Sequence, residues 1–254
     1  TSINVAGILK GTERADECIV YTAHWDHFGI GESENGDSIY NGAVDNGTSM
    51  AWELSIGKAF TGLKERPARS ILLLFPTAEE QGLIGSMHYV ENPVFSMQKT
   101  VACINNDLLL PIGKMKDVMI TGFGASELDD IIGRHAAAQD RYLARDPNSH
   151  TGMYFRSDHF AFARKGVPAL FARGNTDSRE FGKEWASQQE QDYILNRYHR
   201  PSDNYNPEKW NFDGIREDAI LAFLVGYELA TSDYFPQWKP GSEFGHLRKI
   251  QVGN

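Results

Sequence analysis

The chain has 254 residues, of which 41% are hydrophobic and 23% are charged, a composition typical of folded globular proteins. Its formal net charge of -9 argues against nucleic acid and anionic membrane surfaces as partners. No apolar run approaches the roughly 20 residues needed to cross a bilayer, so we expect no membrane-spanning segment. Part of the negative charge would be neutralised if Asp and Glu side chains bind cations.

Strands and helices are predicted to alternate along the chain. The continuous apolar runs at 70–75 and 100–104 have strand length, and such runs are typical of strands that are buried on both faces. In chain order, we predict strands at 4–10 and 17–23, a Gly-rich polar loop at 29–41, a helix at 48–63, a strand at 70–75, a short helix at 82–91, a strand at 100–104, a helix at 126–140, a short helix at 158–165, a strand at 167–172, a long helix at 213–231 and an irregular tail from residue 236.

This alternation predicts an α/β protein, a three-layer α/β/α sandwich with a mixed, mostly parallel central sheet. No internal repeat or linker divides the chain, so we expect residues 1–254 to form a single domain. The chain begins Thr-Ser-Ile-Asn without Met or a signal-like segment, so we expect a mature or trimmed form. The two cysteines, Cys18 and Cys103, lie in apolar stretches. The sequence leaves a disulfide between them as an alternative, but the apolar setting favours buried free thiols.

Three of the apolar runs end directly in residues that can bind a metal. The run CIVYTA leads into His24, SILLLFPTA leads into Glu79 and Glu80, and TVACINN leads into Asp107. In open α/β sheets, ligands bind outside the carboxyl ends of the strands. We therefore predict a metal site where these strand ends converge.

The adjacent carboxylates Glu79 and Glu80 are difficult to explain structurally. Two neighbouring carboxylates repel, and the end of a buried strand is a costly place for both unless cations or protons compensate. One carboxylate that binds zinc, next to one that removes a proton from water, explains the pair.

The other candidates are individually modest. Asp26 could orient the imidazole of His24 as an outer-shell partner. The negative charge of Asp45 could simply stabilise the N-terminus of the following helix. His199 lies in a loop that also contains Asp203. A carboxylate such as that of Asp203 is a common outer-shell partner of a ligand histidine. Two histidines and three carboxylates together form a donor set expected for zinc: His24, Asp45, Glu80, Asp107 and His199.

The motifs TAHWDH, IYNGAVDNGTSM, TAEEQGLIGS, INND, SDHFAFARKGVPAL and YHRPSDNY follow one another along the chain. In this order they resemble metallopeptidase family twenty-eight, the di-zinc aminopeptidases of the secreted bacterial leucine-aminopeptidase type. The resemblance runs from about Asn4 to the final helix. It implies a zinc-dependent aminopeptidase that acts on peptides with a free N-terminus, and a catalytic domain that covers residues 1–254.

The resemblance also implies the ligands of two zinc ions. His24 and Asp107 would bind one ion, and Glu80 and His199 the other. Asp45 would bridge both, together with a water or hydroxide.

Further roles follow from the same resemblance. Glu79 would be the general base, Asp26 would orient His24, and Tyr198 would hydrogen-bond the developing oxyanion. The Asp45–Asn46 peptide bond is expected to be cis. Asp158 is expected close to the substrate cleft, although its place before a short helix fits an N-cap equally well.

Other activities on this scaffold stay open. A dipeptidase or carboxypeptidase would share the metal centre, and a glutaminyl cyclase-like transferase would use one zinc ion. Cyclases of this fold tend to have Trp before the last ligand His, so Tyr198 favours a peptidase. A non-enzymatic binding domain is disfavoured, because all six key positions keep usable chemistry. Family analogy further implies a secreted or periplasmic protein, with a possible additional protease-associated domain.

Overall fold

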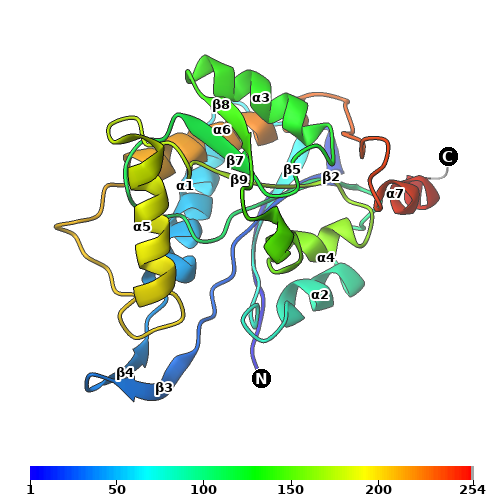
Figure 1. Ribbon diagram of the computed structural model, residues 1–254. Helices are drawn as coiled ribbons and strands as arrows, with labels where there is room; N and C mark the ends of the chain where they lie inside the picture. The colour runs from blue at the N-terminus through cyan, green and yellow to red at the C-terminus, as the bar shows by residue number, and fades with distance from the viewer. Residues whose placement is uncertain (253–254) are drawn as a thin grey trace.

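The computed structural model describes residues 1–252, and the side chains as far as residue 248. A seven-stranded sheet runs through the molecule in the order β1-β5-β2-β6-β9-β7-β8 (Figure 1). The β5, β2, β6 and β9 strands are mutually parallel, β1 is antiparallel to β5, and the parallel pair β7–β8 is antiparallel to β9. The bounds of the sheet strands are β1 Val5–Leu9, β2 Arg14–Thr22, β5 Arg69–Phe75, β6 Thr100–Asn105, β7 Asp117–Ile120, β8 Tyr142–Arg145 and β9 Ala169–Arg173.

Helices cover both faces of this sheet and create two separate hydrophobic cores. One core packs the sheet against α1 (Ser49–Thr61), α3 (Leu128–Ala138) and α6 (Asp213–Thr231). The other packs it against α2 (Ile84–Glu91), α4 (His159–Ala163) and part of the C-terminal tail. A mixed, mostly parallel sheet between two helical layers confirms the predicted three-layer α/β/α sandwich.

The predicted polar loop at 29–41 is wrong, because this segment forms a β-hairpin of β3 (Gly29–Glu34) and β4 (Asp37–Tyr40). Asn35 and Gly36 connect the strands with φ angles of 53° and 89°. An Asn-Gly pair favours such a two-residue hairpin turn, because both positions need positive φ. The hairpin projects from the body below α5 (Gly182–Asn196) (Figure 1).

Two strands, one long helix and two short 3-10 helices, Ser149–Thr151 and Met153–Phe155, were not predicted, and the tail was only partly described. The β7 and β8 strands have four residues each, too few for a clear pattern. Along its 15 residues, α5 buries only Ala186 and Tyr193, so its sequence carries little helical periodicity. The tail from residue 236 ends in a helix, α7 (Gly245–Val252), which Arg248 anchors by donating to the carbonyl oxygens of Met97 and Thr100.

Cys18 and Cys103 are buried free thiols on the neighbouring strands β2 and β6, as their apolar surroundings favour. Within the described part of the chain, no helix has both the length and the apolar character needed to cross a membrane.

Candidate metal centre

The strands β5, β2 and β6 are neighbours in the sheet, and their carboxyl ends carry four of the predicted site residues. His24 follows β2, Asp107 follows β6, and Glu79 and Glu80 follow β5. Because the three strands are parallel, these side chains meet at one edge of the sheet. The predicted convergence at the strand ends is thus present in the structure.

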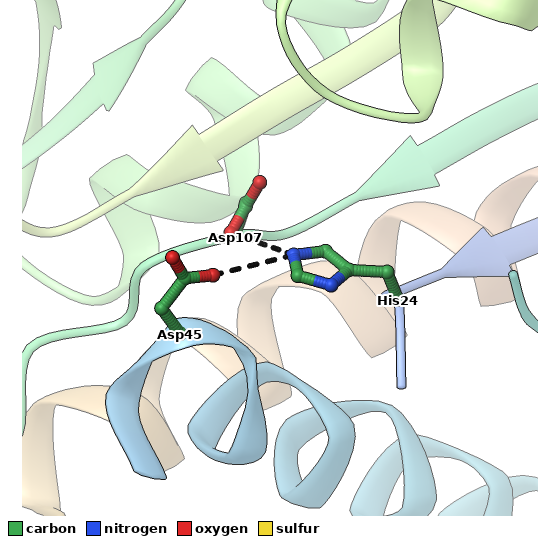
Figure 2. Close-up of side chains that lie close together, drawn as sticks. All are labelled: His24, Asp45 and Asp107. Carbon is green, nitrogen blue, oxygen red and sulfur yellow. Dashed lines mark ion pairs between the residues drawn. The ribbon is translucent and has the colours of Figure 1, made fainter. Parts of the chain in front are cut away.

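Asp45 reaches the same place from the segment Ala43–Thr48, a kinked turn with non-helical backbone angles at Asp45 and Asn46 that leads into α1 (Figure 2). The Asp45–Asn46 peptide bond is cis, as predicted. The carboxylate of Asp203 accepts the backbone N–H groups of Val44 and Asp45, each at 3.1 Å, and the hydroxyl of Tyr193 at 3.2 Å. Asp203 therefore holds the turn that presents Asp45, in keeping with the outer-shell role expected from its type.

The two oxygens of Asp45 face two different histidines. On one side, Nε2 of His24 lies 3.3 Å from Asp45 Oδ1 and 3.5 Å from Asp107 Oδ1 (Figure 2). On the other side, Nε2 of His199 lies 3.2 Å from Asp45 Oδ2 and 3.2 Å from Glu80 Oε2. The five predicted ligands thus form two groups that share Asp45.

These spacings fit zinc ligands better than hydrogen bonds. Nε2 of His24, Nε2 of His199 and Oδ1 of Asp107 are buried atoms without a hydrogen-bond partner in the described structure. Two ligands of one tetrahedral zinc ion, each about 2.0–2.1 Å from the metal, lie about 3.3 Å apart. The four distances of 3.2–3.5 Å agree with that value, so the residues present fit a pair of bound metal ions.

The ionisation of the ligands reflects the concentration of negative charge here. Burial would lower the pKa of both histidines, yet the carboxylates beside them raise the pKa of His24 well above its usual value and that of His199 to about 9. Burial would likewise raise the pKa of Asp45, but His199 and His24 lower it. The site therefore stabilises positive charge, as a cation-binding site must.

Glu79 differs from the ligands in both distance and ionisation. Its Oε2 lies 3.8 Å from Nε2 of His24, farther than any ligand pair above. Burial, followed by the charge of Asp107, raises the pKa of Glu79 to about 10. Cations bound by the neighbouring ligands would favour the ionised form of Glu79, which can take a proton from an attacking water.

Asp26 contacts His24 through its backbone carbonyl rather than through its carboxylate. Its backbone carbonyl oxygen lies 3.1 Å from Nδ1 of His24, whereas its carboxylate is 3.7 Å away. A carbonyl only accepts, so the proton sits on Nδ1 and leaves Nε2 free to bind metal. The Asp26 carboxylate instead accepts the N–H groups of Glu79 and Glu80, at 3.0 and 3.4 Å, and so holds the turn after β5.

Asp158 is buried and lies close enough to His24 and Asp107 for their charges to affect its pKa. Its side chain is fully buried and does not line the cavity beside the metal ligands. The residue is the N-cap of α4, although its side chain makes no capping hydrogen bond, and its closeness to the substrate stays a prediction. Burial raises the pKa of Asp158 to about 7.

A cavity of about 420 Å³ opens beside the metal ligands. Tyr198 lines it, with its ring stacked on His199. Burial and the nearby Asp45 raise the pKa of Tyr198, so its hydroxyl stays protonated and able to donate. Arg156 also lines the cavity, and sequence reasoning missed it. The apolar part of the wall comes from Leu83, Leu108, Met153 and Phe155.

Backbone conformations of high energy gather around the centre. Ala78, Leu83, Leu108 and His199 have φ angles between 54° and 60°, a region that residues other than glycine rarely occupy. Such residues tend to cluster at functional sites, where the surrounding structure enforces them.

His27 is the second residue that sequence reasoning missed. It forms a possible metal-binding group with Asp45 and Glu80, whose ligand atoms all lie within 4.8 Å of one another. Its signal was present in the final position of the motif TAHWDH.

Comparison with known proteins places this site in a family of peptidases. Residues 4–224 match the model of peptidase family M28, so the chain belongs to that family. It is 27% identical over 254 residues to a probable glutamate carboxypeptidase of Arthroderma benhamiae. The alignment covers 92% of this chain and 31% of that protein.

Two solved structures share the fold. A zinc aminopeptidase from Bacillus subtilis aligns with a TM-score of 0.64 at 20% identity, over 91% of this chain and 50% of that one. The glutaminyl cyclase of Porphyromonas gingivalis aligns with a TM-score of 0.58 at 16% identity, over 89% and 76%. The chain thus spans about a third of that curated relative and half of that aminopeptidase.

Proposed function

We propose that this protein is a zinc-dependent exopeptidase, and specifically an aminopeptidase that removes the N-terminal residue of peptides. The observation that carries the proposal is the pair of ligand groups around Asp45, with four nitrogen-to-oxygen distances of 3.2–3.5 Å. His24 and Asp107 would hold one zinc ion, His199 and Glu80 the other, and Asp45 both. Likeness to a Bacillus subtilis zinc aminopeptidase supports the choice of metal and activity.

Bound zinc would supply Lewis acidity, which makes a water more acidic and a carbonyl carbon more electrophilic. The protein supplies the proton transfers. The Glu79 carboxylate takes a proton from the attacking water and returns it to the nitrogen of the leaving amine. Tyr198 donates its hydroxyl proton in a hydrogen bond to the oxygen that becomes negative. The Asp26 carboxylate keeps Glu79 in place by accepting the backbone N–H of Glu79.

A carboxypeptidase is the second candidate, and a specific observation favours it. Arg156 lines the cavity, and a guanidinium is suited to pair with the C-terminal carboxylate of a peptide. The curated relative named as a probable glutamate carboxypeptidase supports the same activity.

A glutaminyl cyclase-like transferase is a weaker candidate. The likeness to the Porphyromonas gingivalis enzyme supports it. The second group of ligands around His199 favours two ions over the single zinc expected of a cyclase.

One substrate panel distinguishes the candidates. Aminoacyl anilides, peptides with acetylated N-termini, peptides with amidated C-termini and a peptide with N-terminal Gln are assayed with zinc and with a chelator. An aminopeptidase cleaves the anilides and the amidated peptides, spares the acetylated ones and stops when zinc is removed. Cleavage of acetylated peptides, or ring closure of the Gln peptide without hydrolysis, would contradict the aminopeptidase proposal.

We also infer that residues 1–254 act as a catalytic domain, and that a longer chain would carry an additional protease-associated domain beside it. The partial coverage of the relatives supports this inference. Family analogy supports secretion or a periplasmic location.

A further inference from the structure

His27 lies beside the His199 half of the centre, yet the ligand set does not use it. The residue sits between β2 and the β3–β4 hairpin, and only 7% of its side chain is exposed. Its Nδ1 lies 2.6 Å from Glu80 Oε1. Because an ionised carboxylate only accepts, Nδ1 donates in a short, charge-assisted hydrogen bond.

The surroundings hold the imidazole of His27 in this position. A Cβ atom on Gly42 would lie 2.6 Å from Cγ of His27, so the backbone of Gly42 lies directly against the ring. The ring of Phe28 packs edge-on against His27 and His199, with centroids 5.0 and 4.7 Å apart. A side chain enclosed in this way has little freedom to change its rotamer.

The two oxygens of Glu80 consequently face in different directions. Oε1 accepts from His27, whereas Oε2 lies 3.2 Å from Nε2 of His199 and faces the centre. A carboxylate without an outer partner rotates freely about its last bond and can offer either oxygen, or both. The hydrogen bond from His27 removes that freedom.

We propose that His27 is a positioning residue, which fixes Glu80 so that only Oε2 binds the metal of the His199 half. The donor set of the second ion then depends on a histidine that does not itself bind metal. Outer-shell partners of this kind commonly change metal affinity by about 10–100-fold. This inference rests on the proposed metal centre.

The test measures zinc affinity in three variants of the whole chain, by competition with a chromophoric chelator. His27→Leu keeps the bulk of the ring but removes the donor. His27→Asn places an N–H at the same number of bonds from the backbone as Nδ1. His88→Leu, at an exposed position in α2, is the matched control.

We expect His27→Leu to bind one zinc ion as tightly as the wild type and the other about 10–100-fold more weakly, with most of the loss restored in His27→Asn. His88→Leu should bind both ions normally. Unchanged affinity for both ions in His27→Leu would overturn the proposal. A loss in His27→Asn as large as in His27→Leu would also overturn it, since the imidazole would then act as a ligand.

Two further measurements keep the result interpretable. Thermal unfolding of the metal-free variants shows whether the fold survives each substitution, and intact folding is expected in all three. If wild-type protein binds no zinc, the proposed metal centre itself fails. If wild type binds two ions and His27→Leu binds both equally well, only the positioning role fails.

Discussion

The two halves of the candidate centre share Asp45 but are built in different ways. The His24 half sits on the ends of buried strands, and the side chain of His24 is only 1% exposed. The side chain of His199 is 34% exposed, and the residue lies in the loop between α5 and α6 with a φ of 57°. The sheet thus places both unshared ligands of the His24 half, whereas in the other half it places Glu80 and loop contacts place His199.

Neighbouring loops and the β3–β4 hairpin supply contacts around this half. Asp203 holds the turn that carries Asp45, and the carboxylate of Glu34 in the hairpin accepts from Arg200 at 3.2 Å. His27 and Phe28 lie at the base of the same hairpin. We infer that the His199 half has the weaker and more adjustable metal affinity.

The largest expected effect comes from Glu79, which serves the reaction rather than either half. Glu79→Gln keeps a side chain of the same shape but cannot accept the proton, so turnover should fall about 10²–10⁴-fold. Both zinc ions should stay bound, as elemental analysis of the purified variant would verify. Turnover within a few-fold of wild type would remove Glu79 from its role as general base.

The next prediction tests the comparison of the halves directly. His199→Ala should lose one zinc ion, keep the other tightly bound and unfold at nearly the wild-type temperature, because this side chain is partly exposed. His24→Ala should lose the tighter ion and unfold at a lower temperature, because it leaves a cavity and buried carboxylates without a cation. Zinc per chain after gel filtration and a thermal melt distinguish the two. Identical behaviour of the variants would refute the difference between the halves.

A smaller effect is expected from His159 in α4, which is fully buried with both ring nitrogens unpartnered in the described structure. Burial lowers the pKa of His159 from 6.5 to about 3. The unfolded chain therefore binds a proton that the folded chain resists. The contribution of neutral His159 is complete above pH 6.5 and is lost as the pH falls from 6.5 towards 3.

Within that window, His159 should reduce the free energy of unfolding by about 1.4 kcal/mol per pH unit. His159→Leu should remove this part of the acid sensitivity, whereas the exposed control His88→Leu should not. Denaturant unfolding at pH 7, 6 and 5 provides the comparison. Equal acid sensitivity of wild type and His159→Leu would exclude this explanation.

Three of the five ligands were predicted from a physical pattern, and the other two were not. His24 and Asp107 in one half, and Glu80 in the other, follow continuous apolar runs, and parallel strands bring their carboxyl ends together whatever the loops do. The hairpin was missed although Asn35-Gly36 signals it, and with it the contact of His27. Contacts between loops depend on tertiary packing, which spacing along the chain does not encode.

Burial depth was the other quantity that sequence did not provide. Asp158 lies in one of the family's motifs, but only the packed structure shows that its side chain is fully buried and does not line the cavity. Sequence also could not show that two groups of Asp26 contact different residues. Its carbonyl oxygen contacts His24, whereas its carboxylate accepts the backbone N–H of Glu79.

The most direct test of the central claim is the zinc stoichiometry of the wild-type protein. Metal-free protein is titrated with zinc in a calorimeter, and bound metal is counted by elemental analysis after gel filtration. The two ligand groups around Asp45 predict two ions per chain that bind with distinguishable affinities. A single ion at saturation, or none, would contradict this account of the centre.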